Sequence, residues 1–298
     1  MIRALLCLLL ASLTLGAADK PAGRSFLMLG GLTQIVDASG QVTWKYPAAT
    51  RDGYILPNGN VLLTLSKNKT YPGGAVVEVT RDQKVVREYK GTQSEVNTAI
   101  LLDNGNIMLT EAGDRPRLLE VARDGSIKVE IPLGCQVTNH HMQSRMARPL
   151  ANGHYLVPQD KTVREYDAAG KVVWERKSPE STLDNRSFCC LRNAAGHTLI
   201  SLTVGSHLIE VDADGKIVWE LRDGDLPGVP VNRTTALSWL PNGNIVFSNY
   251  AARAPQPKLV EITREKKVVW TYTDSSNQGV HEFQLLDDEG KPQVGVLR

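Results

Sequence analysis

Short apolar segments, separated by polar turns, follow one another along almost the whole chain. One recurring pattern is an apolar segment, a turn with Asn-Gly or a similar pair, and a second apolar segment. Asn-Gly suits a two-residue hairpin because both central residues of a type I′ turn need positive φ. Each copy therefore predicts two antiparallel strands. The copies are ILPNGNVLL at 55–63, LLDNGNIML at 101–109, PLANGHYLV at 149–157, RNAAGHTLI at 192–200, WLPNGNIVF at 239–247 and LLDDEGKPQV at 285–294.

A second pattern alternates with the first and has an Asp-Gly-like turn before a strand that ends in Trp. Four of the five tryptophans fall at this one repeat position, which indicates that a large ring fills the same gap in each unit. The copies are IVDASGQVTW at 35–44, EVTRDQKVVR at 78–87, EVARDGSIKV at 120–129, YDAAGKVVW at 166–174, EVDADGKIVW at 210–219 and EITREKKVVW at 261–270.

The two patterns together give four strands in each unit of about 45 residues, the size of one propeller blade. The turn glycines are spaced by 46, 48, 43, 47 and 47 residues, whereas a β-sandwich has no such period. The last copy of the first pattern and the first copy of the second lack partners, so they can complete one blade from both ends of the chain. We therefore predict an all-β, six-bladed β-propeller with four-stranded blades, its ring closed by the N- and C-terminal strands.

The first 18 residues have the features of a signal peptide. Arg3 supplies the positive charge, Ala4 to Leu15 are mostly apolar, and Gly16-Ala17-Ala18 offers small residues for cleavage. About a dozen apolar residues are too few to span a bilayer, and no later segment is long and apolar enough. The sequence thus predicts a signal peptide at 1–18, one propeller domain at 19–298, no transmembrane segment, and a periplasmic or secreted protein.

Charge and cysteine content narrow the function classes. Lys and Arg number 34 against 32 for Asp and Glu, a net charge of +2, which gives no basic face for nucleic acid. Three cysteines follow the predicted signal peptide: Cys135, Cys189 and Cys190. An exported protein held by disulfides usually has a larger, even set, so we expect stability from packing and at least one free thiol.

The unit that ends in Trp, clearest at 167–174 and 212–219, resembles the propeller repeats of the PQQ-like superfamily. Its alternation with Leu-Pro-Asn-Gly-Asn hairpins is similar to secreted PQQ-like propellers of unassigned role and to six-bladed arylsulfotransferase-type propellers. The latter resemblance implies covalent sulfo transfer through channel histidines. The repeat also resembles that of the propeller scaffold of outer-membrane barrel assembly, which is eight-bladed and lipid-anchored. A shared fold does not by itself imply a shared function.

Quinoprotein alcohol dehydrogenases, which belong to the same superfamily, hold PQQ and Ca²⁺ and carry a vicinal disulfide. The pair Cys189-Cys190 invites that comparison, but this chain is much shorter and no metal-and-base constellation matches. We therefore expect no PQQ or other cofactor, and we expect these cysteines to be small buried residues.

In a propeller the innermost strand of each blade lines the central channel, and alternate residues face one side. The residues eight positions before the turn glycines are Arg51, Asn97, Arg145, Phe188 and Thr235, with Glu282 or His281 in the sixth blade. Ten positions before lie Glu95, Gln143, Arg186 and Arg233. Polar residues thus gather where the inner strands begin, which predicts a ligand site at one mouth of the channel. The alternative is that strand starts are simply exposed.

The six histidines divide by position. His154 and His197 follow turn glycines, and His207 opens an outer strand, where we expect it at the surface. His140, His141 and His281 precede inner strands and can meet at the channel mouth. Two adjacent histidines in an extended strand point opposite ways, so a metal site is not expected. His141 and His281 are the candidate catalytic residues.

Arginines at the mouth offer donors for a carboxylate, sulfate or phosphate. The alternative interpretation pairs them with Glu95 and Glu282. The sequence predicts a binding module for a small anionic or sugar-like ligand or a protein partner. Two alternatives stay open, an arylsulfotransferase-like enzyme and a pure interaction scaffold. The predicted ligand-binding residues are Arg51, Glu95, Asn97, His140, His141, Gln143, Arg145, Arg186, Arg233 and His281.

Overall fold

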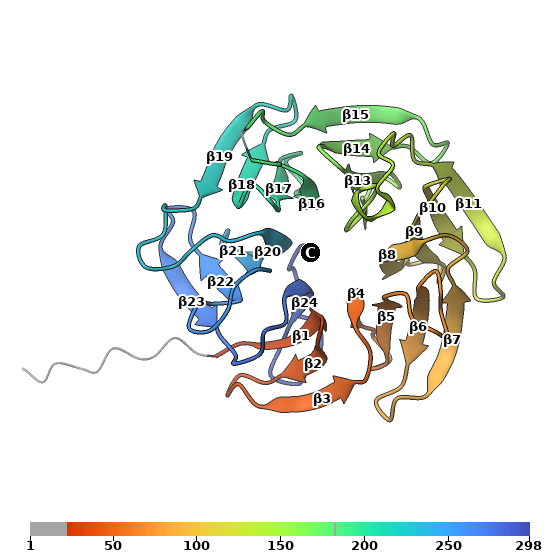
Figure 1. The fold of residues 1–298 in the computed structure, drawn as a ribbon, viewed down its shortest axis with the longest axis horizontal. Helices are drawn as coiled ribbons and strands as arrows, with labels where there is room; N and C mark the ends of the chain where they lie inside the picture. Colours follow the sequence, from red (N-terminus) through yellow and green to blue (C-terminus); the bar gives the residue numbers. More distant parts are fainter. Residues whose placement is uncertain (1–22, 182) are drawn as a thin grey trace, which may run out of the picture.

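The computed structural model describes residues 23–181 and 183–298, and the predicted signal peptide lies outside them. Within these ranges 24 strands form six four-stranded antiparallel sheets (Figure 1). The sheets are arranged as a ring with one strand of each nearest the centre, which confirms the predicted six-bladed propeller. In the described ranges no helix has the length and apolar character needed to cross a membrane.

The blades are numbered I to VI along the chain and their strands are given from the centre outward. Blades I and II contain β4 (Thr50–Ile55), β5 (Val61–Leu65), β6 (Ala75–Val79), β7 (Val85–Lys90), and β8 (Glu95–Leu101), β9 (Ile107–Ala112), β10 (Arg117–Val121), β11 (Ile127–Pro132). Blades III and IV contain β12 (Arg148–Pro149), β13 (Tyr155–Gln159), β14 (Thr162–Tyr166), β15 (Val172–Lys177), and β16 (Ser187–Arg192), β17 (Thr198–Leu202), β18 (His207–Val211), β19 (Ile217–Arg222). Blades V and VI contain β20 (Thr234–Trp239), β21 (Ile245–Asn249), β22 (Leu259–Ile262), β23 (Val268–Tyr272), and β24 (Val280–Leu286), β1 (Ser25–Gly30), β2 (Thr33–Val36), β3 (Val42–Tyr46).

Blade VI combines strands from the two ends of the described chain. Strand β24 pairs with β1 in antiparallel register from Ser25 with Leu286 to Gly30 with Val280. Because β1 takes the place of a second strand, the segment after Gly290 does not build the sheet as the other hairpins do. Two isolated bridges form there instead, between Leu286 and Pro292 and between Trp239 and Leu297. The predicted ring closure is confirmed, and the sixth hairpin is reduced to its turn.

A repeated polar contact joins the two hairpins in blades I to V and explains the recurring Glu of the second pattern. The residue after the turn glycine bonds to this glutamate, as Asn60 does with Glu78 at 2.6 Å and Asn244 with Glu261 at 2.8 Å. In two blades a histidine takes the role of the asparagine. His154 and His197 are therefore turn residues with a structural contact, to Glu165 at 2.6 Å and to Glu210 at 2.7 Å.

The recurring tryptophans join neighbouring blades. The indole N–H of Trp44 donates to the carbonyl oxygen of Arg81 at 2.9 Å, and that of Trp174 donates to Ala213 at 3.1 Å. Trp219 makes the same bond to Arg264 at 2.9 Å. In each case the acceptor lies in the turn before the outer strand of the next blade. The single repeat position thus serves as an inter-blade hydrogen bond as well as packing.

The innermost strands are bulged near their starts. In β4 two residues, Arg51 and Asp52, face one residue of β5, and β16 and β20 show the same irregularity. In blade VI the extra residue is His281. A bulge re-aims side chains and breaks the strict alternation of faces. In blades I, II, IV and V the positions eight residues before the turn glycines are these bulges, whereas in blade III that position, Arg145, precedes β12. In blade VI His281 rather than Glu282 occupies the equivalent place.

Two further sequence expectations concern single side chains. His207 is only 2% exposed, so the expectation of a surface residue was wrong. It opens β18, a middle strand of blade IV covered on both sides, rather than an outer strand. The three cysteines in the described ranges are all free, and Cys189 and Cys190 are fully buried, as expected.

Candidate functional site

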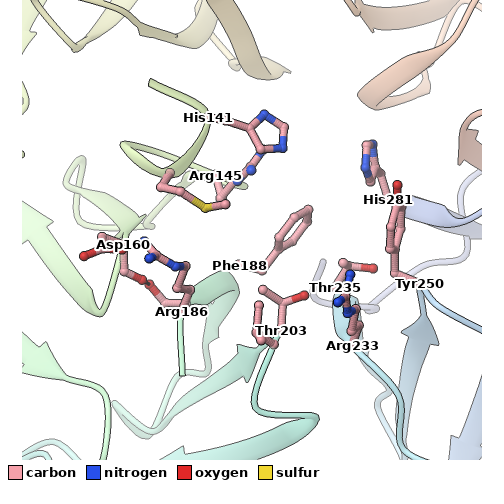
Figure 2. A pocket seen from close by; sticks show the side chains of 13 residues that line it. His141, Arg145, Asp160, Arg186, Phe188, Thr203, Arg233, Thr235, Tyr250 and His281 are labelled. Carbon is pink, nitrogen blue, oxygen red and sulfur yellow. Dashed lines mark hydrogen bonds and ion pairs between the residues drawn. The ribbon is translucent and has the colours of Figure 1, made fainter. Parts of the chain in front are cut away.

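A pocket of about 140 Å³ lies at the end of the ring where the innermost strands begin, which we call the top face. Its walls come from blades III to VI and from the segment before β12 (Figure 2). The lining residues are His141, Met142, Arg145, Asp160, Arg186, Ser187, Phe188, Thr203, Val204, Arg233, Thr235, Tyr250 and His281. Five of the predicted site residues therefore share this pocket: His141, Arg145, Arg186, Arg233 and His281.

Arg145 is the most unusual cation of the pocket. It is only 7% exposed, and its guanidinium lies over the Phe188 ring, 5.2 Å from the centroid. Among the residues that the structure describes, no carboxylate lies within ion-pair distance of it. Burial lowers the pKa of Arg145 to about 9, and the charge of Arg51 acts in the same direction. The side chain is thus a charged donor at neutral pH that lacks a counter-ion.

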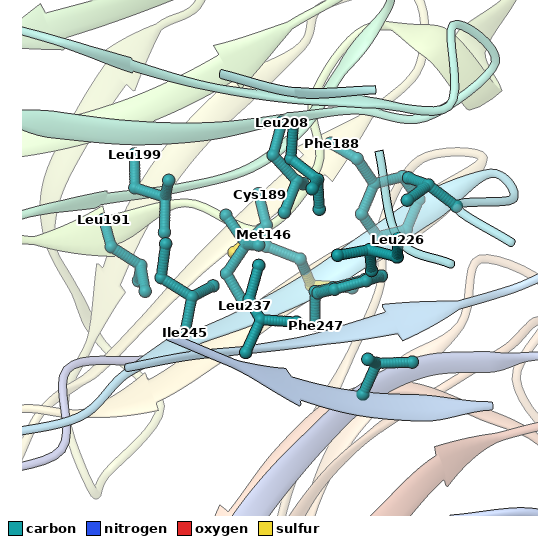
Figure 3. Packing of buried hydrophobic residues seen from close by; sticks show 14 residues of the cluster. Met146, Phe188, Cys189, Leu191, Leu199, Leu208, Leu226, Leu237, Ile245 and Phe247 are labelled. Carbon is teal, nitrogen blue, oxygen red and sulfur yellow. The ribbon is translucent and has the colours of Figure 1, made fainter. Parts of the chain in front are cut away.

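The wall beneath Arg145 is rigid because Phe188 belongs to a core cluster between blades IV and V. Phe188 packs there with Met146, Cys189, Leu208 and Phe247 (Figure 3). Both Cys189 and Phe247 are fully buried. Close packing of this kind holds a side chain in one conformation. The cation of Arg145 therefore rests on a fixed aromatic surface.

Beside the pocket, His141 and Arg51 share the carboxylate of Glu95. His141 Nδ1 lies 3.0 Å from Oε2 of Glu95, and Arg51 Nη2 lies 3.2 Å from Oε1. Burial raises the pKa of Glu95, but the hydrogen bond from His141 and the charge of Arg51 outweigh it and hold the pKa at about 2. The ionised carboxylate thus faces Nδ1 of His141, and Arg51 Nη1 lies 3.3 Å from the same nitrogen.

His281 and Tyr250 form the opposite wall. Their rings are stacked, with centroids 4.9 Å apart and planes 10° apart. His281 Nδ1 lies 3.4 Å from the carbonyl oxygen of Thr50, to which it donates. Burial lowers the pKa of His281 to about 3, and the charges of Arg51 and Arg145 add to this effect. The imidazole is therefore neutral at pH 7.

The other two arginines differ in their pairing. Arg186 is neutralised by Asp160 and by Asp184, whose Oδ2 lies 2.5 Å from its Nε. Arg233 is exposed and has no ion pair within the described ranges. Its φ is 50° and that of Asp160 is 46°, so two non-glycine residues of the pocket have left-handed backbone. Such conformations are uncommon and gather at functional sites.

Five predicted site residues lie outside the pocket. Arg51 and Glu95 stand behind His141, as described above. His140 contacts Ser94 at 2.6 Å and faces away, and the Gln143 side chain bonds to the backbone of Gly113 at 2.8 Å and of Val137 at 3.0 Å. Asn97 is buried, and neither polar atom of its amide has a partner in the described ranges.

Sequence reasoning missed the contributions of Asp160, Thr203 and Tyr250. They lie in or at the start of the loops between the second and third strands of blades III, IV and V. Those loops reach the same end of the ring as the starts of the inner strands. These residues can be found from the sequence when the loops between the second and third strands are considered together with the starts of the inner strands. In the described ranges no group of three or more His, Cys, Asp and Glu side chains is placed to hold a metal ion.

The fold and this site define a six-bladed propeller with a polar pocket on its axis. The PQQ_2 family profile, described as outer membrane protein assembly factor BamB, matches residues 128–295, more than half of the chain. The chain therefore belongs to the PQQ_2 family. No curated protein matches it.

Three solved structures illustrate how widely this fold is shared. A protein of unknown function from Bacteroides caccae has 22% identity and a TM-score of 0.74, over 88% of this chain and 98% of that one. A catalytically inactive virginiamycin B lyase from Staphylococcus aureus with quinupristin has 15% identity and a TM-score of 0.61, over 91% and 94%. The WD40 propeller domain of Doa1 has 13% identity and a TM-score of 0.60, over 95% and 90%. These likenesses concern the fold alone.

Proposed function

We propose that the protein is an exported propeller that binds a small anionic ligand in the top-face pocket. The observation that carries this proposal is Arg145, a buried guanidinium with no counter-ion in the described ranges. An unpaired buried charge is costly, and an anionic ligand offsets that cost when it binds. Arg233 supplies a second unpaired cation from the opposite side of the pocket.

The top-face pocket has room for a small ligand. A cavity of about 140 Å³ suits a single-ring carboxylate, sulfate or phosphate. The family name refers to PQQ, which quinoprotein dehydrogenases hold together with Ca²⁺. The described residues lack a metal group beside the pocket. We therefore derive no role for that cofactor.

The test compares charged and uncharged ligands of the same shape by isothermal calorimetry. Glucuronate is paired with glucose, and 4-nitrophenyl sulfate with 4-nitrophenol, on the full-length mature protein. We expect an anion to bind and its neutral partner not to bind. Arg145→Met should reduce that binding at least about tenfold, since one hydrogen bond to a charged group contributes about 1.5–3 kcal/mol. The exposed turn residue Arg123 provides the control, Arg123→Met.

The thermal stability of the variants separates folding from binding. Arg145→Met should unfold at the same or a higher temperature than the parent because it removes an uncompensated buried charge. Equal binding by both partners of each pair, or unchanged anion binding in Arg145→Met, would contradict the proposal. In that case the top face would serve a protein partner, and a pull-down with the exported fraction would be the next step.

The contact between Glu95 and His141 favours an arylsulfotransferase-like enzyme as the second candidate. A carboxylate on Nδ1 orients the imidazole and raises the nucleophilicity of Nε2. In this reaction the Nε2 lone pair attacks sulfur, and the S–O bond breaks with its electron pair leaving on the aryl oxygen. The oxygen of an acceptor phenol then attacks sulfur, and the N–S bond breaks with its electron pair returning to His141. The proton of the acceptor phenol passes to the aryl oxide released in the first step.

Release of 4-nitrophenol from 4-nitrophenyl sulfate, followed by absorbance, tests this second candidate. We expect turnover only with an acceptor phenol present, and loss of turnover in His141→Gln. The turn histidine variant His154→Gln is the matched control because its ring contacts only the glutamate of its own blade. Binding of 4-nitrophenyl sulfate without turnover would support the binding-module hypothesis and contradict the enzyme hypothesis.

A further inference from the structure

The opposite end of the ring, the bottom face, is crossed by residues 291–298, which we call the strap. This arrangement follows from the ring closure, because β1 occupies the sheet position that the end of the sixth hairpin would otherwise take. The displaced segment turns over the inner strands instead. Figure 1 shows the C-terminus lying near the centre of the ring rather than at its edge.

The strap is anchored to two blades. Leu297 pairs with Trp239 through two backbone hydrogen bonds, of 2.8 and 3.0 Å, and Gln293 N–H donates to the carbonyl oxygen of Leu285 at 3.1 Å. The guanidinium of Arg298 then reaches the axis, where Nη2 donates to the carbonyl oxygen of Gly53 at 2.6 Å. The strap is thus a fixed wall.

A cavity of about 270 Å³ lies between the strap and the ends of the inner strands. Apolar and polar groups share its walls about equally. The lining residues are Tyr54, Ile100, Leu101, Arg148, Pro149, Gln284, Leu285, Pro292, Gln293, Val296 and Arg298. None of these residues lines the top-face pocket, so the two cavities are separate.

Two buried donors of this cavity have no partner among the described residues: the hydroxyl of Tyr54 and Nε of Arg148. Burial raises the pKa of Tyr54 well above its usual range, so the hydroxyl keeps its proton. The other two nitrogens of Arg148 are engaged, Nη2 with Glu282 at 2.6 Å and Nη1 with Asp52 at 3.2 Å. Most buried donors in proteins are satisfied, so two unsatisfied ones in one cavity indicate a missing acceptor.

The charges around the cavity are already matched. Arg148 contacts both Asp52 and Glu282, and Arg298 lies 3.4 Å from Asp52 and 3.8 Å from Glu282. Two guanidinium groups thus face two carboxylates. A ligand with its own negative charge would approach those carboxylates without an unpaired cation to compensate. An uncharged acceptor, such as a carbonyl oxygen, satisfies the two donors without this cost.

We infer that the bottom-face cavity is a second binding site, for a small branched apolar molecule that carries an uncharged carbonyl oxygen. The carbonyl accepts from Tyr54 and Arg148, while the apolar body contacts Ile100, Leu101 and Val296. This site is independent of the anion pocket. The strap lies outside the sheet because β1 takes the second-strand position of blade VI, and it completes the wall of this site.

The test uses 4-methylpentanamide as the probe and 4-methylpentanoate as its charged match, each titrated by saturation-transfer NMR. We expect the amide to bind, and the carboxylate to bind at least about tenfold more weakly. Tyr54→Phe removes only the hydroxyl. It should weaken amide binding about tenfold because the ligand loses one hydrogen bond. Tyr46→Phe, on an outer strand, is the control for hydroxyl removal. Gln293→Trp fills the cavity from the strap, and Val294→Trp is its control because Val294 is 89% exposed.

The melting temperature of each variant shows whether it still folds. Removing an unsatisfied buried hydroxyl should leave the melting temperature of Tyr54→Phe equal to or above that of the parent. Arg145→Met in the other pocket should leave amide binding unchanged. The inference is overturned if the amide does not bind at millimolar concentration or if the carboxylate binds better. Unchanged amide binding in both Tyr54→Phe and Gln293→Trp also overturns it.

Discussion

The imidazole of His281 lies flat against the ring of Tyr250, with 4.9 Å between centroids, and is wedged beside two arginines. This position explains why the imidazole stays neutral. Protonation would carry a desolvation cost and bring a third positive charge next to Arg51 and Arg145. The neutral ring can accept a hydrogen bond but contributes no charge to anion binding.

His281 should make the protein acid-sensitive below pH 6.5. Its pKa is about 3 in the folded state against 6.5 as the ordinary value, so the unfolded chain binds the proton first. The stability is full above pH 6.5 and is lost as the pH falls toward 3, by about 2 kcal/mol at pH 5. Urea unfolding of the parent and of His281→Phe at pH 7.5 and pH 5 measures this, and the parent should lose more stability. A parallel decline in both proteins would assign the sensitivity to another group.

Glu95→Gln should destabilise the protein at pH 7 by about 2–3 kcal/mol, because it leaves Arg51 buried without its carboxylate. The pKa of Glu95 is about 2 in the folded state against 4.5 ordinarily. The stabilisation is therefore present above pH 4.5 and is lost as the pH falls toward 2. The difference between parent and variant in guanidinium unfolding should be large at pH 7 and less than half as large at pH 3. A difference that does not change with pH would contradict this origin.

Lys258 should be essential for the segment that leads to His281. It is fully buried, and its Nζ donates to Asp274 at 2.6 Å and to both Oγ and O of Ser276, at 2.6 and 2.9 Å. Lys258→Met should cost about 3 kcal/mol in chemical unfolding because it leaves Asp274 without its partner. Lys266→Met is the control, since its ion pair with Asp225 is about one third exposed and worth roughly 0–1 kcal/mol. Equal losses of stability in the two variants would contradict a special role for the buried pair of Lys258 and Asp274.

Trp174→Phe should lower stability by about 1–2 kcal/mol, measured as a shift in thermal unfolding. The change removes the inter-blade hydrogen bond to Ala213, and it weakens the contact with Arg192, whose guanidinium lies 4.4 Å from the indole centroid. The comparison variant is Trp239→Phe, because Trp239 lies outside the repeat position. If both variants lose the same stability, ring size rather than the blade-to-blade bond explains the effect.

The repeat made the fold predictable, because each turn glycine marks the same point of a four-stranded unit. Gly59 and Gly105 lie 46 residues apart, and both close the turn between the first two strands of a blade. The same register located Arg145 and His281 at one end of the ring. Local turn chemistry and a fixed period were sufficient for these conclusions.

The details of the site could not be predicted from the repeat, since they depend on where the copies differ. The bulges break the alternation of faces, so Asp52 and Arg148 meet on the axis although neither was a candidate. Tyr250 enters the pocket from a loop whose length differs between blades. His207 was misplaced because its strand was taken for an outer one. Such features depend on contacts between blades, which no single repeat contains.

The pairing of β1 with β24 has a consequence for the order of folding. Strand β1 is the first of the described strands, and its hydrogen-bonding partner on the inner side, β24, is the last of them, so the ring closes only when the two pair. Until then the edge of β1 stays open, and contacts so distant in sequence form slowly. The ring therefore stays open until these two segments, far apart in the chain, have met in blade VI.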